Sequence, residues 1–206
     1  MQTLRSEVSD FYSDAEIEKT YNLEVQELVA KATGAKRVFV FDHTRRSDSQ
    51  KMQSERTIRE PAWFVHNDYT ERSARRRVRD FLGEEADELL KRRFAIINVW
   101  RSMAGTVEST PLAMCDARSI DASDLVASER RAKDHVGEVQ QALHSERQRW
   151  VCFPQMSADE ALLIKVFDAV DDGRAQSSIH SAFVDPATPE GAPPRESIET
   201  RTFVFF

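Results

Sequence analysis

The amino-acid sequence predicts an α+β protein that is mainly β, with a core built as an antiparallel sandwich or barrel. Two observations support this class. Helical periodicity comes early in the chain, and strand-like runs come late. The strand-like runs are short and bounded by turn residues, as in folds with two packed sheets. The 206 residues contain no internal repeat and no Gly/Ser-rich linker, so we expect one domain spanning 1–206.

The first part of the chain is expected to form a helix, a strand and a loop. Apolar residues recur at helical spacing over 13–32, with Ser13 as N-cap, Glu16 three residues later and Gly34 as the stop signal. The β-branched and aromatic residues at 36–42 predict a strand. The stretch 44–60 has almost no apolar residues, so an exposed loop is expected there.

The rest of the chain alternates between strand-like and polar segments. The run 62–69 is strand-like, a helix is expected at about 73–92, and the apolar run 94–100 is typical of a strand buried on both faces. The polar segment 121–145 is helix-prone. Further strands are expected at 111–116, 150–153, 161–167, 174–180 and 199–206, which brings the number of strand candidates to eight. Both long helices are expected to pack outside the barrel.

Composition and charge exclude several classes of function. With 29 basic and 35 acidic residues the net charge is −6, which disfavours binding to a nucleic-acid backbone or an anionic membrane surface. No run approaches the ~20 apolar residues of a membrane helix. Residues 1–7 mix charges without an apolar segment, so no secretory signal is expected. Cys115 and Cys152 are too few for a disulfide framework or a thiolate metal site. A cytoplasmic protein acting on a small molecule fits these features.

The triplet His66-Asn67-Asp68 is the sharpest chemical feature. On a strand, side chains two residues apart point to the same face, so the imidazole and the carboxylate converge. A second histidine would complete a two-histidine, one-carboxylate set that leaves open positions on Fe(II) for a chelating cosubstrate and O2. His180 is preferred because it ends a strand-like run and lies 114 residues after His66, far enough to return across a barrel. The other candidates are His43, His135 and His144.

A row of polar residues marks the last strand-like run. Arg195, Ser197, Glu199 and Arg201 share one strand face. Two arginines that point into a barrel are costly unless an anion pairs with them. A dicarboxylate such as 2-oxoglutarate would supply that anion, with a guanidinium gripping its distal carboxylate and Ser197 adding a hydroxyl donor.

Each of these features also has a purely structural explanation. His66 and Asp68 could form a hydrogen-bonded pair, and His180 could be an ordinary buried histidine. Arg195 and Arg201 could pair with Glu196 or Glu199 on an exposed strand. The basic run 72–79 adjoins acidic residues at 84–88, and a solvated face with salt bridges explains it best. No single structural explanation covers the metal pair, the distal histidine and the arginine face together.

Several ordered stretches carry a family resemblance. The most specific is 192–199 together with Arg201, and further matches are 65–70, around His66 and Asp68, 94–101 and 180–183. Shorter matches lie at 32–35, 40–44, 111–119, 159–165 and 172–175. From about residue 10 to 206 the sequence resembles the gibberellin-desaturase-like or cephamycin-7α-methoxylase-like family of non-haem iron oxidoreductases of fungi and bacteria. Members of that family are usually longer at the N-terminus.

The resemblance implies a fold and a chemistry. The fold is a double-stranded β-helix (jelly roll, cupin-like) with flanking helices. The chemistry is hydroxylation or desaturation of a small-molecule secondary metabolite with Fe(II), 2-oxoglutarate and O2. The same resemblance implies that His66, Asp68 and His180 are the metal ligands.

The last strand also resembles that of the alkylated-nucleic-acid dioxygenases. That likeness implies that Arg195 grips the distal carboxylate of 2-oxoglutarate, whereas Arg201 approaches the carboxylate next to the keto group. Asn98 stands where those enzymes carry an asparagine on a strand facing the cosubstrate.

Two other functions stay open at this point. A family member that has lost catalysis could act as a partner or binding subunit, but the presumed ligands and the arginine are all present. A nucleic-acid demethylating dioxygenase is disfavoured by the acidic balance. An apolar or amphipathic substrate fits the aromatic residues expected near the metal, and a homodimer or heterodimer is compatible with the sequence. Those aromatic residues are Trp63, Phe64, Tyr69, Trp100 and Phe183.

Overall fold

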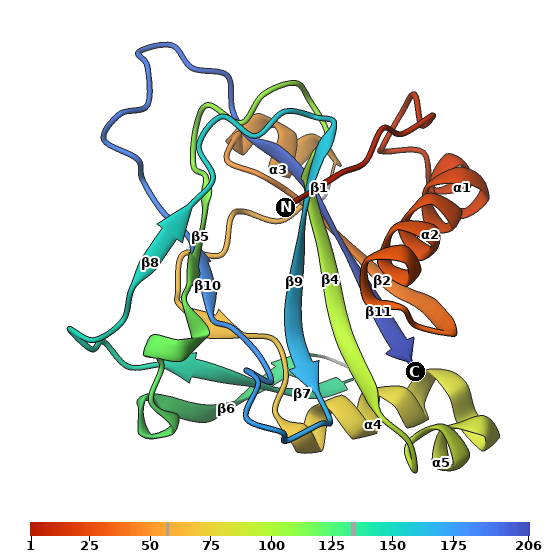
Figure 1. Ribbon diagram of the computed structural model, residues 1–206. Coiled ribbons are helices and arrows are strands. Elements are labelled where there is room, and N and C mark those ends of the chain that lie inside the picture. Colours follow the sequence, from red (N-terminus) through yellow and green to blue (C-terminus); the bar gives the residue numbers. More distant parts are fainter. Residues whose placement is uncertain (57, 133–134) are drawn as a thin grey trace.

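The computed structural model describes residues 1–56, 58–132 and 135–206, which form two facing antiparallel sheets with flanking helices (Figure 1). One sheet has the strand order β1-β9-β4-β11-β2, and the other has the order β6-β7-β3-β10-β5-β8. The strands of the first sheet are β1 Gln2–Thr3, β9 Glu160–Asp168, β4 Phe94–Ser102, β11 Glu196–Phe205 and β2 Arg37–Ser47. Those of the second are β6 Leu125–Ala132, β7 His135–Ala142, β3 His66–Asn67, β10 His180–Ala182, β5 Leu112–Cys115 and β8 Trp150–Cys152. This arrangement confirms the expected jelly roll.

Alternation along β4 divides the interior into two layers. Every residue of β4 is buried. Ala95, Ile97 and Val99 pack with Val25 and Val29 of the N-terminal helix, on the outer face of the sheet. Phe94, Ile96 and Trp100 point the other way, into the space between the two sheets. A strand that is covered on both faces reads as a continuous apolar run, which is why the sequence identified it as central.

The N-terminal helix follows its sequence signals closely. It comprises α1 (Asp14–Glu16), a π-helical turn (Ile17–Tyr21) and α2 (Asn22–Thr33). The Ser13 side chain accepts a hydrogen bond from the Glu16 amide, and Gly34 ends the helix in the left-handed conformation at φ 73°. As expected, this helix lies outside the barrel, against the five-stranded sheet (Figure 1).

The helix after Asp68 covers one end of the barrel. It is divided into α4 (Glu71–Leu82), a 3-10 turn (Gly83–Glu85) and α5 (Ala86–Leu89). Ala74, Val78 and Leu82 share one apolar cluster with inner-face residues such as Phe94 and Phe203. The helix therefore lies outside the two sheets, as expected, with its apolar face on the inner cluster. It closes one end of the interior because the inward-facing aromatic residues of β4 and β11 need a cover there.

Two polar segments form strands rather than the expected loop or helix. The stretch 44–60 continues β2 to Ser47 and then forms α3 (Gln50–Arg56). The segment 121–145 contains the hairpin β6–β7, preceded by two 3-10 turns at Ala117–Ser119 and Ala122–Asp124. Strand β6 lies at the edge of its sheet, where the side chains reach water and need not alternate in polarity. Because both segments are polar, the pattern of apolar residues did not predict the strands in them.

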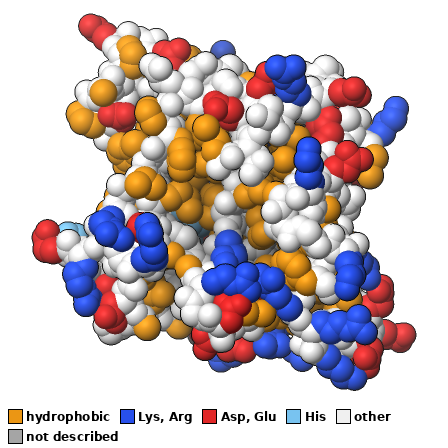
Figure 2. Space-filling model, in the orientation of Figure 1, with side chains coloured by type: hydrophobic (Ala, Val, Ile, Leu, Met, Phe, Trp, Pro, Cys, Tyr) orange, Lys and Arg blue, Asp and Glu red, His pale blue; other side chains and the backbone are white. Residues whose placement is uncertain are grey.

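Other expected strands are shorter than their sequence patterns indicated. The run 62–69 contributes only His66–Asn67, and the run 174–180 contributes only the start of β10. No helix in the described part of the chain combines the length and the apolar character needed to cross a lipid bilayer. On the face drawn in Figure 2, apolar side chains gather near the middle of the molecule and charged side chains surround them.

Candidate metal centre

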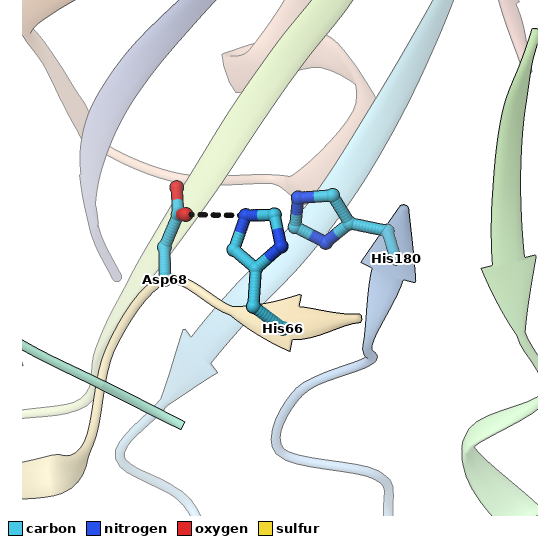
Figure 3. A group of neighbouring side chains, drawn as sticks. All are labelled: His66, Asp68 and His180. Atoms are coloured by element: carbon cyan, nitrogen blue, oxygen red, sulfur yellow. Dashed lines mark ion pairs between the residues drawn. The ribbon is translucent and has the colours of Figure 1, made fainter. Parts of the chain in front are cut away.

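His66, Asp68 and His180 converge between the two sheets (Figure 3). His66 lies on β3 and His180 lies directly opposite it on the antiparallel neighbour β10, so both rings face the same side. The ring centroids are 4.5 Å apart. His66 Nε2 is 3.4 Å from Asp68 Oδ1, and one ligand atom of each residue lies within 4.8 Å of the others. The geometry brings together one carboxylate and two imidazoles that are far apart in the sequence.

The tautomers of the two histidines suit a metal ion. His66 Nδ1 lies 2.9 Å from the Phe64 carbonyl and donates to it, which leaves the Nε2 lone pair facing Asp68. His180 Nδ1 is buried and has no hydrogen-bond partner among the described residues. Burial lowers the pKa of His180, and the neighbouring His66 lowers it further, so His180 is held neutral. Burial lowers the pKa of His66, but the contact with Asp68 outweighs burial and raises that pKa, so metal binding at this imidazole would displace a proton.

Asp68 is held as a carboxylate by its second oxygen. Asp68 Oδ2 accepts hydrogen bonds from Asn98 Nδ2 at 2.8 Å and from Arg201 Nε at 3.1 Å. Burial by itself would raise the pKa of Asp68, but the Arg201 guanidinium and the contact with His66 outweigh burial and hold that pKa well below its ordinary value. The donor set of two imidazoles and one carboxylate therefore fits a divalent transition metal.

Arg201 is shared among three carboxylates. Besides Asp68, it lies 2.9 Å from Glu199 and 2.9 Å from Asp42, and it donates to Thr44 Oγ1 at 2.7 Å. These contacts of the Arg201 guanidinium are thus with Asp68 and with residues of β2 and β11 near it. Asn98 joins the same network by donating to Glu199 Oε1 at 2.9 Å. In the structure both residues orient Asp68.

Arg195 lies on the other side of the histidines and is almost fully buried, with 3% of its surface exposed. Its NH1 donates to the Thr110 carbonyl at 2.6 Å, its guanidinium carbon lies 5.7 Å from the Trp100 ring centre, and its Nε has no partner among the described residues. Burial lowers the pKa of Arg195 to about 10. A buried cation with an unused donor is a site for an anion.

A cavity connects this arginine with the histidines. His66 and His180 line it together with Arg195, Glu199 and Trp100, and Arg46 completes its charged wall. Ser197 is buried on the same face of β11, between Arg195 and Glu199, and is paired in register with Arg46. The first two polar residues of the expected face therefore lie near the cavity, and the fourth, Arg201, lies beside Asp68.

The remaining histidines lie away from this centre. His43 points to the outer face of β2, where its ring Nδ1 is 2.9 Å from Thr200 Oγ1. His144 is exposed beside Glu146, and the side chain of His135 lies outside the described residues. Among the aromatic residues, Tyr69 and Trp100 line cavities at the centre and the Phe64 ring is 5.0 Å from His66. Trp63 and Phe183 instead line a separate groove.

The sequence analysis did not identify several charged residues of the site. Asp42, Thr44 and Arg46 on β2 face the interior and contact Arg201 or line the cavity. Asp48 Oδ2 accepts from Thr110 Oγ1 at 2.6 Å and so supports the turn that binds Arg195. Polar residues at every second position from 42 to 46 were a usable signal, because that period is typical of one strand face.

Comparisons with known proteins point in one direction. Residues 1–205 match the model of a family described as "Oxidoreductase/YMDC permease-like domain". The chain is 36% identical to the Fe(II)/2-oxoglutarate-dependent dioxygenase nvfI of Aspergillus novofumigatus, over 93% of this chain and 68% of that protein. It is 37% identical to the hydroxylase/desaturase CTB9 of Cercospora beticola, over 89% of this chain and 62% of that protein.

A solved structure is similar over most of the chain. The iron and alpha-ketoglutarate-dependent endoperoxidase NvfI superposes with a TM-score of 0.87 and 32% sequence identity, covering 94% of this chain and 71% of that one. The chain spans about three-fifths of the length of several curated relatives, for example 57% of the aspirochlorine biosynthesis protein N of Aspergillus oryzae.

Proposed function

We propose that this chain is an enzyme that oxidises a small molecule with Fe(II), 2-oxoglutarate and O2. The chain belongs to the family of Fe(II)/2-oxoglutarate-dependent hydroxylases, desaturases and dioxygenases that these relatives represent. One observation carries this proposal. The buried His66, Asp68 and His180 offer ligand atoms within 4.8 Å of one another, and the buried Arg195 lines the cavity beside them.

Each residue has a role in this proposal. His66, Asp68 and His180 hold the iron, and Arg195 grips the distal carboxylate of 2-oxoglutarate with help from Ser197. When bound, the iron would activate O2, and 2-oxoglutarate would supply two electrons through its decarboxylation to succinate and CO2, so that O2 can oxidise an unreactive C–H bond of the substrate. Arg201 and Asn98 keep the Asp68 carboxylate ionised and oriented. Trp100 and Leu112 help to exclude water from the 2-oxoglutarate cavity.

The substrate belongs to small-molecule secondary metabolism in this proposal. The net charge of −6 speaks against a nucleic-acid substrate, and the relatives carry names from biosynthetic pathways, such as aspirochlorine biosynthesis protein N. A closer kinship with the gibberellin-desaturase-like or cephamycin-7α-methoxylase-like members is part of the same proposal.

An anaerobic titration tests the proposal directly. Fe(II) and then 2-oxoglutarate are added to the purified protein, and the weak visible charge-transfer band of the iron chelate is recorded. We expect the band in the natural protein and in His144→Gln, whose histidine is exposed, and we expect no band in His180→Gln. If the natural protein gives no band at saturating reagents, the cosubstrate assignment is wrong.

A further inference from the structure

A second cavity, of about 250 Å³, lies on the Asp68 side of the centre. Asp68, Tyr69 and Arg201 line it next to the metal-binding residues. The 2-oxoglutarate cavity is on the opposite side, with His66, His180 and Arg195. The two cavities share none of their lining residues. The cavity beside Arg195 is about 10 Å³ in this structure, so side chains there must move to admit 2-oxoglutarate, whereas the second space is already open to another molecule.

Besides Arg201, four arginines from three distant segments line the second cavity. Arg59 follows α3, Arg76 and Arg77 lie on α4, and Arg130 lies on β6. In the fold, some arginines of the basic run 72–79 line this cavity and others do not. Arg75 pairs with Glu71 at 3.1 Å and Arg79 pairs with Asp87 at 3.1 Å, which are the surface salt bridges that the sequence predicted. Arg76 and Arg77 instead belong to the cavity wall.

The acidic residues of this cavity are engaged in other interactions. Asp42 and Asp68 both bind Arg201. Glu138 binds Arg72, which is not part of the wall, and Thr70. The hydrogen bond from Arg72 lowers the pKa of Glu138, and Arg76 adds to that effect. Arg77 is 3.9 Å from Asp80, and its guanidinium carbon lies 4.9 Å from the centre of the Phe81 ring. The wall thus carries an excess of positive charge directly beside the metal-binding carboxylate.

We propose that the substrate of this enzyme carries a carboxylate, which these arginines bind while the reacting part of the molecule lies near Asp68. This inference rests on the proposed function, because it assigns the second cavity to the substrate. Arginine suits the task because its planar guanidinium matches a carboxylate and stays charged. Tyr69 and Val139 supply a less polar wall for the rest of the substrate.

A matched pair of probes tests the proposal without knowledge of the natural substrate. The probes are 2-naphthoate and 2-naphthamide, which share a ring system and differ in charge. Binding is measured by calorimetry under anaerobic conditions, on the protein loaded with Fe(II) and saturating 2-oxoglutarate so that Arg195 is already occupied. We expect the natural protein to bind the carboxylate at least tenfold more tightly than the amide.

Two double variants with the same change in charge separate the cavity from the general surface. Arg59→Gln with Arg77→Gln removes two wall arginines, and Arg75→Gln with Arg79→Gln removes two that pair elsewhere. The first double variant should bind both probes equally, and the second should keep the tenfold preference. Equal loss in both variants, or no preference or no naphthoate binding in the natural protein, overturns the proposal. The charge-transfer band reports the proposed function separately, so the two failures are distinguishable.

Discussion

Arg201 Nε lies 3.1 Å from Asp68 Oδ2, so the second arginine on the inner face of β11 supports a carboxylate of the metal centre. Among the residues that the structure describes, no carboxylate is hydrogen-bonded to Arg195, which instead donates to a backbone carbonyl. The two arginines therefore face opposite sides of the centre. One stabilises the protein's own anions and the other is available for an incoming anion.

Replacing Arg195 with Leu should weaken the binding of 2-oxoglutarate selectively. The loss of a charged, buried hydrogen-bond donor corresponds to roughly 1.5–4 kcal/mol, or one to three orders of magnitude in the apparent requirement for 2-oxoglutarate. The charge-transfer titration measures this shift. Arg201→Leu is the comparison variant, and it should cost less 2-oxoglutarate affinity. The opposite ranking would show that the roles of the two arginines are reversed.

Asp48→Ala should also weaken 2-oxoglutarate binding, although Asp48 does not line the cavity. Asp48 holds the Thr110 hydroxyl at 2.6 Å, and Thr110 is strained at φ 46° while its carbonyl binds Arg195. Without Asp48 the turn relaxes and Arg195 loses its orientation.

We expect the apparent dissociation constant for 2-oxoglutarate to rise about tenfold, which corresponds to roughly 1.4 kcal/mol. Binding of 2-oxobutyrate, which lacks the distal carboxylate, should stay unchanged. Ser109→Ala is the control, because Ser109 binds the same Asp48 oxygen but leaves the Thr110 contact in place. An equal loss for both oxo acids would contradict a role through Arg195.

Arg201→Leu should lower the free energy of unfolding more than Arg195→Leu does. It leaves Asp68 and Glu199, whose side chains are 10% and 7% exposed, without their counter-charge. Removing one partner of a buried ion pair costs about 3–5 kcal/mol. Urea denaturation of the metal-free protein measures the change. A loss below ~1 kcal/mol would mean that water or a shifted pKa compensates these carboxylates.

Stability should fall in mild acid because of His43. Burial lowers the pKa of His43 to about 4, and nearby charges modify this value less strongly. The unfolded chain binds a proton near pH 6.5, whereas the folded chain keeps His43 neutral until about pH 4. The destabilisation caused by His43 is therefore absent above pH 7. It grows as the pH falls from 6.5 to 4, to at most about 3 kcal/mol.

The measurement for this prediction is the free energy of unfolding at several pH values between 7 and 4. His43→Gln should flatten the profile over that range. His144→Gln, which changes an exposed histidine in the same way, should follow the natural protein. Parallel profiles for the natural protein and His43→Gln would refute the assignment.

Local signals in the sequence determined the elements that depend on near neighbours. Ser13 and Gly34 mark the ends of the first helix because caps act within one helical turn. The alternation Arg195, Ser197, Glu199, Arg201 defines a polar face because side chains on a strand repeat every two residues. Asp68 lies one residue beyond β3, yet its carboxylate is 3.4 Å from His66 Nε2, so nearness in the sequence was enough to predict this pair.

Only the tertiary structure decided what those faces meet. Residues distant in the sequence, Asp68 and Asp42, bind Arg201, and the strand period does not show which partner lies opposite. The position of α4 depends on which apolar surface it covers, and the β6–β7 hairpin depends on which strands pair. Both are contacts between distant residues, so a local sequence pattern cannot predict them. Packing also placed Arg77 in the wall of the cavity that Asp68 lines, and Arg75 in an ion pair with Glu71 outside that wall, although both arginines lie on one helix. The sequence determined which side chains each element presents, and the closure of the two sheets determined their partners, because long-range contacts form only when the whole chain is folded.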